Sequence, residues 1–125
     1  MEGYIQTISN GTLKRYVQFL EINNDPELIA QYRYWHSEAH HWQEIREGIK
    51  AVGILEMEIY MLGNQLVMIV DAPVDFNWDE AMNRLATLPR QAEWEEFVAQ
   101  FQQCEKSATS DQKWRMMDRI FYLYE

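Results

Sequence analysis

The chain has 125 residues, 47% of them hydrophobic, and a formal net charge of −9. This length predicts a single domain with its own hydrophobic core, at residues 13–125 after an N-terminal arm at residues 1–12. The negative charge argues against nucleic acid or an anionic membrane surface as a partner, and no apolar run is long enough to span a membrane. Cys104 is the only cysteine, which excludes an intramolecular disulfide and favours the reducing cytoplasm.

The first strand is predicted at Lys14–Ile22, where aromatic and β-branched residues cluster over a strand's length. Asp25 is suited to cap a helix that has Pro26 at its first position. Apolar residues then recur at gaps of three and four over Leu28–Ile49, which predicts one continuous helix. Gly53 marks its end.

A hairpin is predicted next. The segment Leu55–Met61 alternates between apolar and polar residues, as a half-buried strand does. Gly63 and Asn64 form a typical tight turn. The following segment, Leu66–Val70, is apolar at every position and is expected to be buried on both faces.

The last third of the chain predicts two helical stretches and a strand. Asn77 is suited to cap the first stretch, which Pro89 ends. A further helical stretch is predicted at Gln91–Gln103, followed by a polar loop at residues 105–112. The segment Arg115–Tyr124 is predicted as the last strand.

The order strand, helix, strand, strand, helix, strand is that of the ferredoxin-like, split βαβ fold of the α+β class. In this fold the first and third strands are central, and helices cover only one face of the sheet. A second copy of the chain is the simplest cover for the other face. The pattern therefore predicts a homodimer of the dimeric α/β barrel type.

All three histidines lie in the segment YRYWHSEAHHW, residues 32–42. Tyr32 and His36 are four residues apart and so share one helix face, where a hydroxyl and an imidazole can line a partly dry pocket. Imidazole is the usual general acid/base near neutral pH. The alternative is that both are amphipathic core residues whose polar tips are satisfied.

The same segment contains a possible metal-binding row, His36, His40 and Glu44, at intervals of four. The sequence HSEAH is not the H-E-x-x-H pattern, and two helical turns place a rigid third ligand far from the first. We therefore expect no metal.

Other candidate residues have two interpretations each. Glu58 and Tyr60 share a strand face and either line a site or face solvent or a partner. Trp94 either stacks on a sugar or fills the core. Asp118 is expected on the last strand, pointing into a pocket, with Arg119 on the opposite face.

Several segments together resemble the L-rhamnose mutarotase family, over roughly residues 14–123. No single segment is specific, but their order along the chain agrees with the family. They are Y-x-x-x-H at Tyr32 and His36, W-x-E-I at Trp42–Ile45, G-I-x-x-M-E-I-Y-x-x-G-N-x-L-x-M-I at Gly53–Ile69, E-W-E at Glu93–Glu95 and D-R-I-F-Y-L at Asp118–Leu123.

The resemblance implies a dimeric ferredoxin-like protein that interconverts the α and β anomers of a deoxy-sugar without a metal or organic cofactor. It implies that His36 is the catalytic proton donor and that Tyr32 binds the substrate one turn before it. Trp94 corresponds to the first residue of a tandem tryptophan pair.

Departures from the family pattern concern the sugar more than the acid/base chemistry. Glu95 replaces the second tryptophan, and a substrate-binding tyrosine falls at Met57. Two additional residues lie between His36 and Trp42, and Gln43 replaces the expected proline. The M-E-I-Y segment resembles the branch that includes L-fucose mutarotases.

The expected function is therefore mutarotation of a monosaccharide such as L-rhamnose or L-fucose. Opening and closing the sugar ring requires proton transfer and orientation but no nucleophile, metal or redox centre. His36 would exchange the proton, while Tyr32, Trp94, Met57, Glu58 and Asp118 would contact the sugar. Two alternatives stay open: a different dimeric α/β barrel enzyme, such as a monooxygenase-like protein, and a module that binds a metabolite without turnover.

Overall fold

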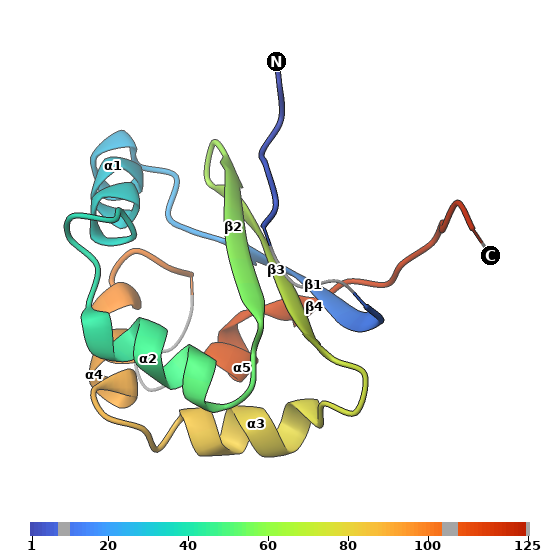
Figure 1. Cartoon of the computed structure of the whole chain (residues 1–125). Helices are drawn as coiled ribbons and strands as arrows, with labels where there is room; N and C mark the ends of the chain where they lie inside the picture. The colour runs from blue at the N-terminus through green and yellow to red at the C-terminus, as the bar shows by residue number, and fades with distance from the viewer. Residues whose placement is uncertain (8–10, 104–107, 125) are drawn as a thin grey trace.

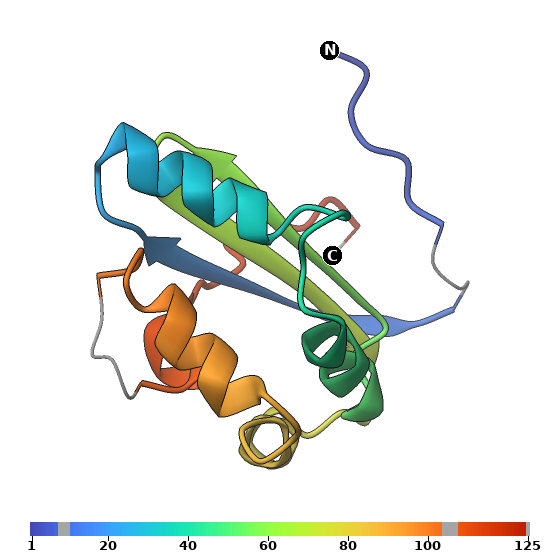
Figure 2. The same cartoon turned by 90° about the vertical axis from the view of Figure 1, so that its left-hand side faces the viewer.

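The computed structural model describes residues 1–7, 11–103 and 108–124, so that Cys104 lies outside the described residues. It has a four-stranded antiparallel sheet with the order β2-β3-β1-β4. Helices cover one face of the sheet, and both chain ends extend away from the body (Figures 1 and 2). Within the described ranges, no helix has the length and apolarity that crossing a membrane requires.

The elements confirm the predicted α+β ferredoxin-like plan, with the first and third strands at the centre of the sheet. Their bounds are β1 Leu13–Glu21, α1 Pro26–Trp35, α2 Gln43–Ala51, β2 Glu56–Leu62, β3 Gln65–Pro73, α3 Trp78–Leu85, α4 Gln91–Val98, α5 Ser110–Lys113 and β4 Arg115–Met116.

The central strand β3 organises the core. Its alternate residues Leu66, Met68 and Val70 point toward the helices and are at most 6% exposed. The residues between them, Val67 and Ile69, lie on the opposite side of the sheet and are half-buried. Both sides of β3 are therefore apolar, as predicted, but only the helix side is fully covered within one chain.

The predicted single helix over Leu28–Ile49 is wrong, because α1 ends at Trp35 and α2 begins at Gln43. Neither glycine nor proline causes this break. Instead, the His36 imidazole and the Ser37 hydroxyl bond to main-chain carbonyl oxygens of the last turn of α1, at 2.6 and 2.7 Å. Side chains that satisfy these carbonyls offer the main chain an alternative to continuing the helix.

The predicted last strand is also much too long. Only Arg115–Met116 pairs with β1, followed by one further bond in which the Met117 N–H donates to the Val17 carbonyl oxygen at 2.8 Å. Residues 118–124 then leave the sheet on the side opposite the helices (Figures 1 and 2). Their composition favours a strand, but a strand also needs a neighbour to pair with.

The end of the second helical region differs from the prediction as well. Helix α4 ends at Val98, five residues before the predicted Gln103. The predicted polar loop contains a short helix, α5, which starts after Thr109 with a capping box. Residues 104–107 of this region lie outside the described residues.

The N-cap of α1 gives a direct test of local stability. The Asp25 carboxylate accepts hydrogen bonds from the N–H groups of Glu27 and Leu28 at 2.9 and 3.2 Å. We expect Asp25→Ala to lower the free energy of unfolding by about 1 kcal/mol, measured by urea denaturation. Asp25→Asn, which caps equally well, should change it little; equal losses in the two variants would contradict this role.

Candidate functional site

A cavity of about 400 Å³ lies between the helices and the helix-facing side of the sheet. Its size falls in the range of small-molecule pockets. It combines aromatic and aliphatic walls with a few polar groups. Its lining includes Tyr32, Trp35, His36, Trp42, Ile45, Arg46, Met57, Met68, Gln91, Trp94, Glu95, Gln102 and Trp114.

His36 occupies the C-cap of α1, so its ring stands where the helix stops. Its Nδ1 lies 2.6 Å from the Tyr32 carbonyl oxygen. A carbonyl oxygen only accepts hydrogen bonds, so Nδ1 carries the proton, and in the neutral ring Nε2 has a lone pair. Burial lowers the pKa of His36; the bond to the Tyr32 carbonyl opposes this shift and the nearby Arg46 charge adds to it.

Tyr32 fixes the plane of the imidazole. The two rings are stacked with their centroids 4.2 Å apart. Tyr32 is 3% exposed, and its hydroxyl accepts a hydrogen bond from the Gln102 amide at 3.3 Å. The phenol is thus anchored at its polar end while its face supports His36.

Tryptophans form the aromatic wall beside His36. Trp94 makes edge contacts with His36 at 5.3 Å and with Trp42 at 5.1 Å between ring centroids. The Arg90 guanidinium lies 4.0 Å above the Trp42 ring. Arg90 has a φ of 64°, a conformation that costs energy for a residue with a side chain. Its ion pairs with Glu44 and Glu93 help to hold it there.

A polar wall is formed by Gln91 and Glu95, one turn apart on α4. The Lys113 ammonium, which is fully buried, donates to the Glu95 carboxylate at 3.0 Å and to the Glu95 carbonyl oxygen at 2.6 Å. The Gln91 amide donates to the other carboxylate oxygen of Glu95 at 3.0 Å. Burial raises the pKa of Glu95, while Lys113 and Gln91 favour the charged form.

The structure brings together four of the residues singled out from the sequence. Tyr32, His36, Met57 and Trp94 all line the cavity, although they lie on α1, at its C-cap, on β2 and on α4. Met57 is on the helix side of β2, as the alternation in that strand predicts.

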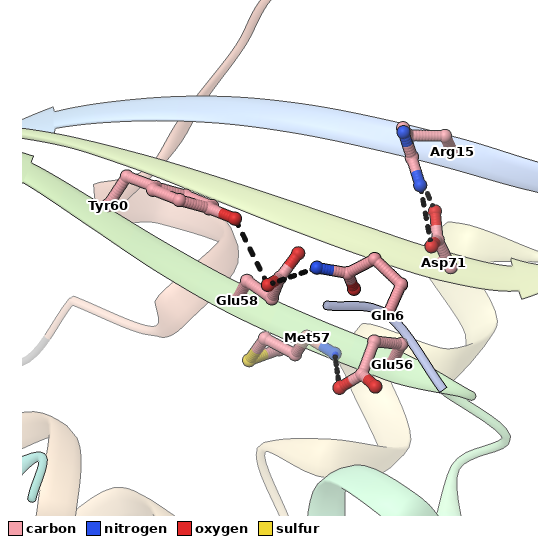
Figure 3. Close-up of polar contacts among 7 residues, drawn as sticks. All are labelled: Gln6, Arg15, Glu56, Met57, Glu58, Tyr60 and Asp71. Atoms are coloured by element: carbon pink, nitrogen blue, oxygen red, sulfur yellow. Dashed lines mark hydrogen bonds and ion pairs between the residues drawn. The ribbon is translucent and has the colours of Figure 1, made fainter. Parts of the chain in front are cut away.

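Glu58 and Asp118 do not line this cavity. Glu58 lies on the other side of β2, where it accepts hydrogen bonds from the Tyr60 hydroxyl at 3.1 Å and the Gln6 amide at 3.0 Å (Figure 3). Asp118 is exposed, beyond the end of β4. The prediction that Asp118 and Arg119 lie within a strand, with Asp118 facing a pocket, is wrong for this reason.

The row of His36, His40 and Glu44 does not form, because these residues are not on one helix. His40 stacks on Tyr34 with centroids 3.8 Å apart, and Glu44 pairs with Arg90 at 3.4 Å. Across the described ranges, no group of three or more His, Cys, Asp or Glu side chains is placed to hold a metal ion.

The polar wall was not predicted as a unit. Glu95 stood out only as a departure from a tryptophan, and Lys113 lay at the edge of a segment expected to be loop. The signal that identifies the wall is the capping box at Thr109, which starts α5 and places Lys113 in a helical turn. Its contact with Glu95, eighteen residues away, depends on tertiary packing.

Comparisons of sequence agree with one another. The model of the L-rhamnose mutarotase family matches residues 15–123. An L-fucose mutarotase from Xanthomonas campestris pv. campestris is 33% identical over 114 residues, which cover 91% of this chain and 91% of the relative. A UPF0734 protein from Dictyostelium discoideum is 32% identical over 114 residues, covering 88% and 90% of the two chains.

A solved structure supports the fold. The crystal structure of an L-rhamnose mutarotase from Formosa agariphila matches with a TM-score of 0.65 and 18% sequence identity. The match covers 88% of this chain and 98% of the other.

The burial of His36 predicts a pH dependence of stability. Because the pKa of His36 is lower in the folded state, the unfolded chain binds the proton first as the pH falls below about 6.5. His36 therefore contributes stability above this pH, which is lost between the unfolded and the folded pKa. Urea denaturation at several pH values should show a smaller loss on acidification in His36→Phe than in the wild type.

The same protonation state can be observed directly by nitrogen-15 NMR. We expect the neutral ring with its proton on Nδ1 at pH 7. A signal from the tautomer with its proton on Nε2 would contradict the hydrogen bond to the Tyr32 carbonyl, and an imidazolium signal at pH 7 would contradict the lowered pKa.

Proposed function

Because the chain belongs to the L-rhamnose mutarotase family, whose members are carbohydrate isomerases, we propose that its cavity interconverts the anomers of a deoxyhexose such as L-rhamnose or L-fucose. The observation that carries this proposal is the position of the His36 imidazole at the cavity wall, where burial lowers its pKa. Its Nδ1 proton is fixed on a main-chain carbonyl, which leaves Nε2 for the substrate. We propose His36 as the catalytic residue and Tyr32, Trp94 and Met57 as substrate-binding residues.

Ring opening uses the lone pair of Nε2. His36 accepts the proton of the anomeric hydroxyl as the bond between the anomeric carbon and the ring oxygen breaks, and the ring oxygen takes up a proton from solvent water. The sugar becomes an open-chain aldehyde, which rotates to present its other face. A positioned acid/base group contributes roughly 10²–10⁴-fold to such a step.

Ring closure reverses the transfer. The hydroxyl adds to the other face of the aldehyde and loses its proton to solvent water, while the His36 imidazolium returns its proton to the former carbonyl oxygen. His36 acts as a base in opening and as a proton donor in closing, the role that the family resemblance implies. Protons balance over the cycle, so the proposal needs no metal or organic cofactor.

The aromatic wall suits the apolar side of a deoxyhexose. Trp94 and Trp42 meet edge to face beside His36 and offer ring surface to C–H groups and to a methyl substituent. Met57 adds a flexible apolar side chain on the sheet side of the cavity.

The proposed activity is tested by saturation-transfer proton NMR on the anomeric signals of L-fucose and L-rhamnose. Wild-type protein should speed up anomer exchange, and His36→Ala should lose roughly 10²–10⁴-fold of the acceleration while keeping its circular dichroism spectrum. His40→Ala is the matched control, since His40 packs on Tyr34, away from the cavity. Exchange at the wild-type rate in His36→Ala would exclude His36 as the catalytic residue.

We further propose that the protein works as a homodimer in the cytoplasm. The side of the sheet opposite the helices, here called the open face, carries half-buried apolar residues such as Val17, Phe19, Val67 and Ile69. The C-terminal segment on that side exposes Ile120, Phe121 and Leu123 at 96%, 72% and 68%. Apolar surface of this extent is typical of a protein interface, and a two-fold pairing would let each tail cover the other copy. The single cysteine supports the location.

Analytical ultracentrifugation tests the dimer. The wild type should sediment with twice the chain mass of 15.0 kDa, and Ile69→Lys should shift the population to monomer because it places a charge on the open face. Ala51→Lys is the control, since it adds the same charge on the helix side. A monomeric wild type at micromolar concentration would rule out this assembly.

A further inference from the structure

We propose that Gln91, Glu95 and Lys113 form a hydroxyl-binding subsite that determines which sugar the enzyme accepts. This inference rests on the proposed function, because it concerns the same cavity. It assigns to Glu95 a role that a tryptophan at this position could not fill: a carboxylate that binds hydroxyl groups in place of a ring that stacks.

The first argument is the placement of Gln91 and Glu95 at the cavity wall, where Lys113 supports Glu95 from behind the lining. Gln91 and Glu95 are 5% and 7% exposed and both line the cavity that holds His36. They also line a smaller cavity of about 230 Å³ and, with Leu85 and Ser110, lie between the two spaces. His36 lines only the larger one.

The second argument is the number of hydrogen-bond acceptors. Each oxygen of the Glu95 carboxylate receives one protein donor, Lys113 on one side and Gln91 on the other. A carboxylate has about four acceptor sites, so both oxygens retain capacity. The Gln91 Oε1 atom is buried and has no hydrogen-bond partner within the described part of the chain.

Unused buried acceptors are costly unless a donor reaches them. A sugar presents several adjacent O–H groups, each able to donate, and a carboxylate can accept from two of them at once. An apolar substrate offers nothing to these oxygens. The subsite therefore favours a polyhydroxylated ligand in the cavity.

The third argument concerns charge. Lys113 has no exposed side-chain surface, and its ammonium contacts Glu95 at both the carboxylate and the main-chain oxygen. Two contacts to one residue hold the carboxylate in a single orientation. A fixed carboxylate can distinguish sugars that differ only in which hydroxyl groups they carry or in their configuration.

Sugar analogues that lack one hydroxyl group should reveal whether the subsite distinguishes between sugars. A site built to hydrogen-bond a substrate hydroxyl strongly rejects an analogue that lacks it, because the site's own polar atoms are then left unpaired. We expect wild-type kcat/KM to fall by at least about 10²-fold for one or more of the 2-deoxy, 3-deoxy and 4-deoxy analogues of the preferred sugar, L-fucose or L-rhamnose.

The test variant is the double substitution Glu95→Leu with Lys113→Met. Replacing both partners avoids a buried unpaired charge, which single substitutions would leave. The wild type should have a higher kcat/KM for the parent sugar than for the deoxy analogue. In the variant, kcat/KM for the parent sugar should fall by most of this difference, while kcat/KM for the analogue should change little. The ratio of the two kcat/KM values should therefore approach one. A purely structural role would lower both rates together and leave the ratio unchanged.

A second variant covers the case in which the double variant does not fold. Gln91→Leu removes the unpartnered acceptor and one donor to Glu95 without changing charge, and should also reduce the ratio. Gln43→Leu is its matched control, because Gln43 is an exposed residue of α2 that does not line the cavity. The subsite proposal would be overturned if the folded variants keep the wild-type ratio of kcat/KM values. It would also be overturned if the wild type has the same kcat/KM for the parent sugar and for every deoxy analogue.

Binding is measured in parallel through tryptophan fluorescence, since Trp42, Trp94 and Trp114 line the cavity. If the wild type binds sugars selectively without speeding up anomer exchange, and the variants lose this selectivity, the mutarotase proposal fails and the subsite stands. If the wild type neither binds nor converts any of the sugars, both fail.

Discussion

The pairing of β3 with both of its neighbours is the constraint on which the rest of the structure depends. Nine residues of β3 pair with β1 and seven with β2, in registers that fix the direction of every side chain. Slipping either register by one residue would move Leu66, Met68 and Val70 from the helix side to the open face. Because the registers hold, the helices and the cavity lie on one side, and the apolar surface that remains lies on the other.

Local chemistry made much of this fold predictable. The caps at Asp25 and Asn77 and the alternation in β2 depend on neighbouring residues, and each was found where the sequence indicated it. The break between α1 and α2 was missed because side-chain bonds from His36 and Ser37 end the helix without a glycine or proline. The last strand was overestimated because composition cannot show where a strand loses its partner.

The candidate site, like the fold, could be predicted from the sequence only where neighbouring residues determine it. Tyr32 and His36 share one helical turn, so spacing alone could place them together, and the structure stacks their rings. The contact between Glu95 and Lys113 joins two helices across a stretch that no periodic pattern describes. Nor does stability account for this pair, since well-packed apolar residues of similar volume generally serve a core at least as well. A role in binding explains why a carboxylate and an ammonium stand in this wall.

The burial of His36 affects the two halves of the proposed reaction in opposite directions. Desolvation makes the imidazole a weaker base, but it makes the imidazolium a stronger acid, and mutarotation uses each form once per turnover. The Tyr32 carbonyl limits this shift, because it stabilises a positive ring through the Nδ1 proton. The Tyr32–His36 turn thus combines a partly dry wall with a proton affinity that remains useful near neutral pH. A more deeply buried ring without the carbonyl would be too weak a base to take up the proton of the anomeric hydroxyl in ring opening.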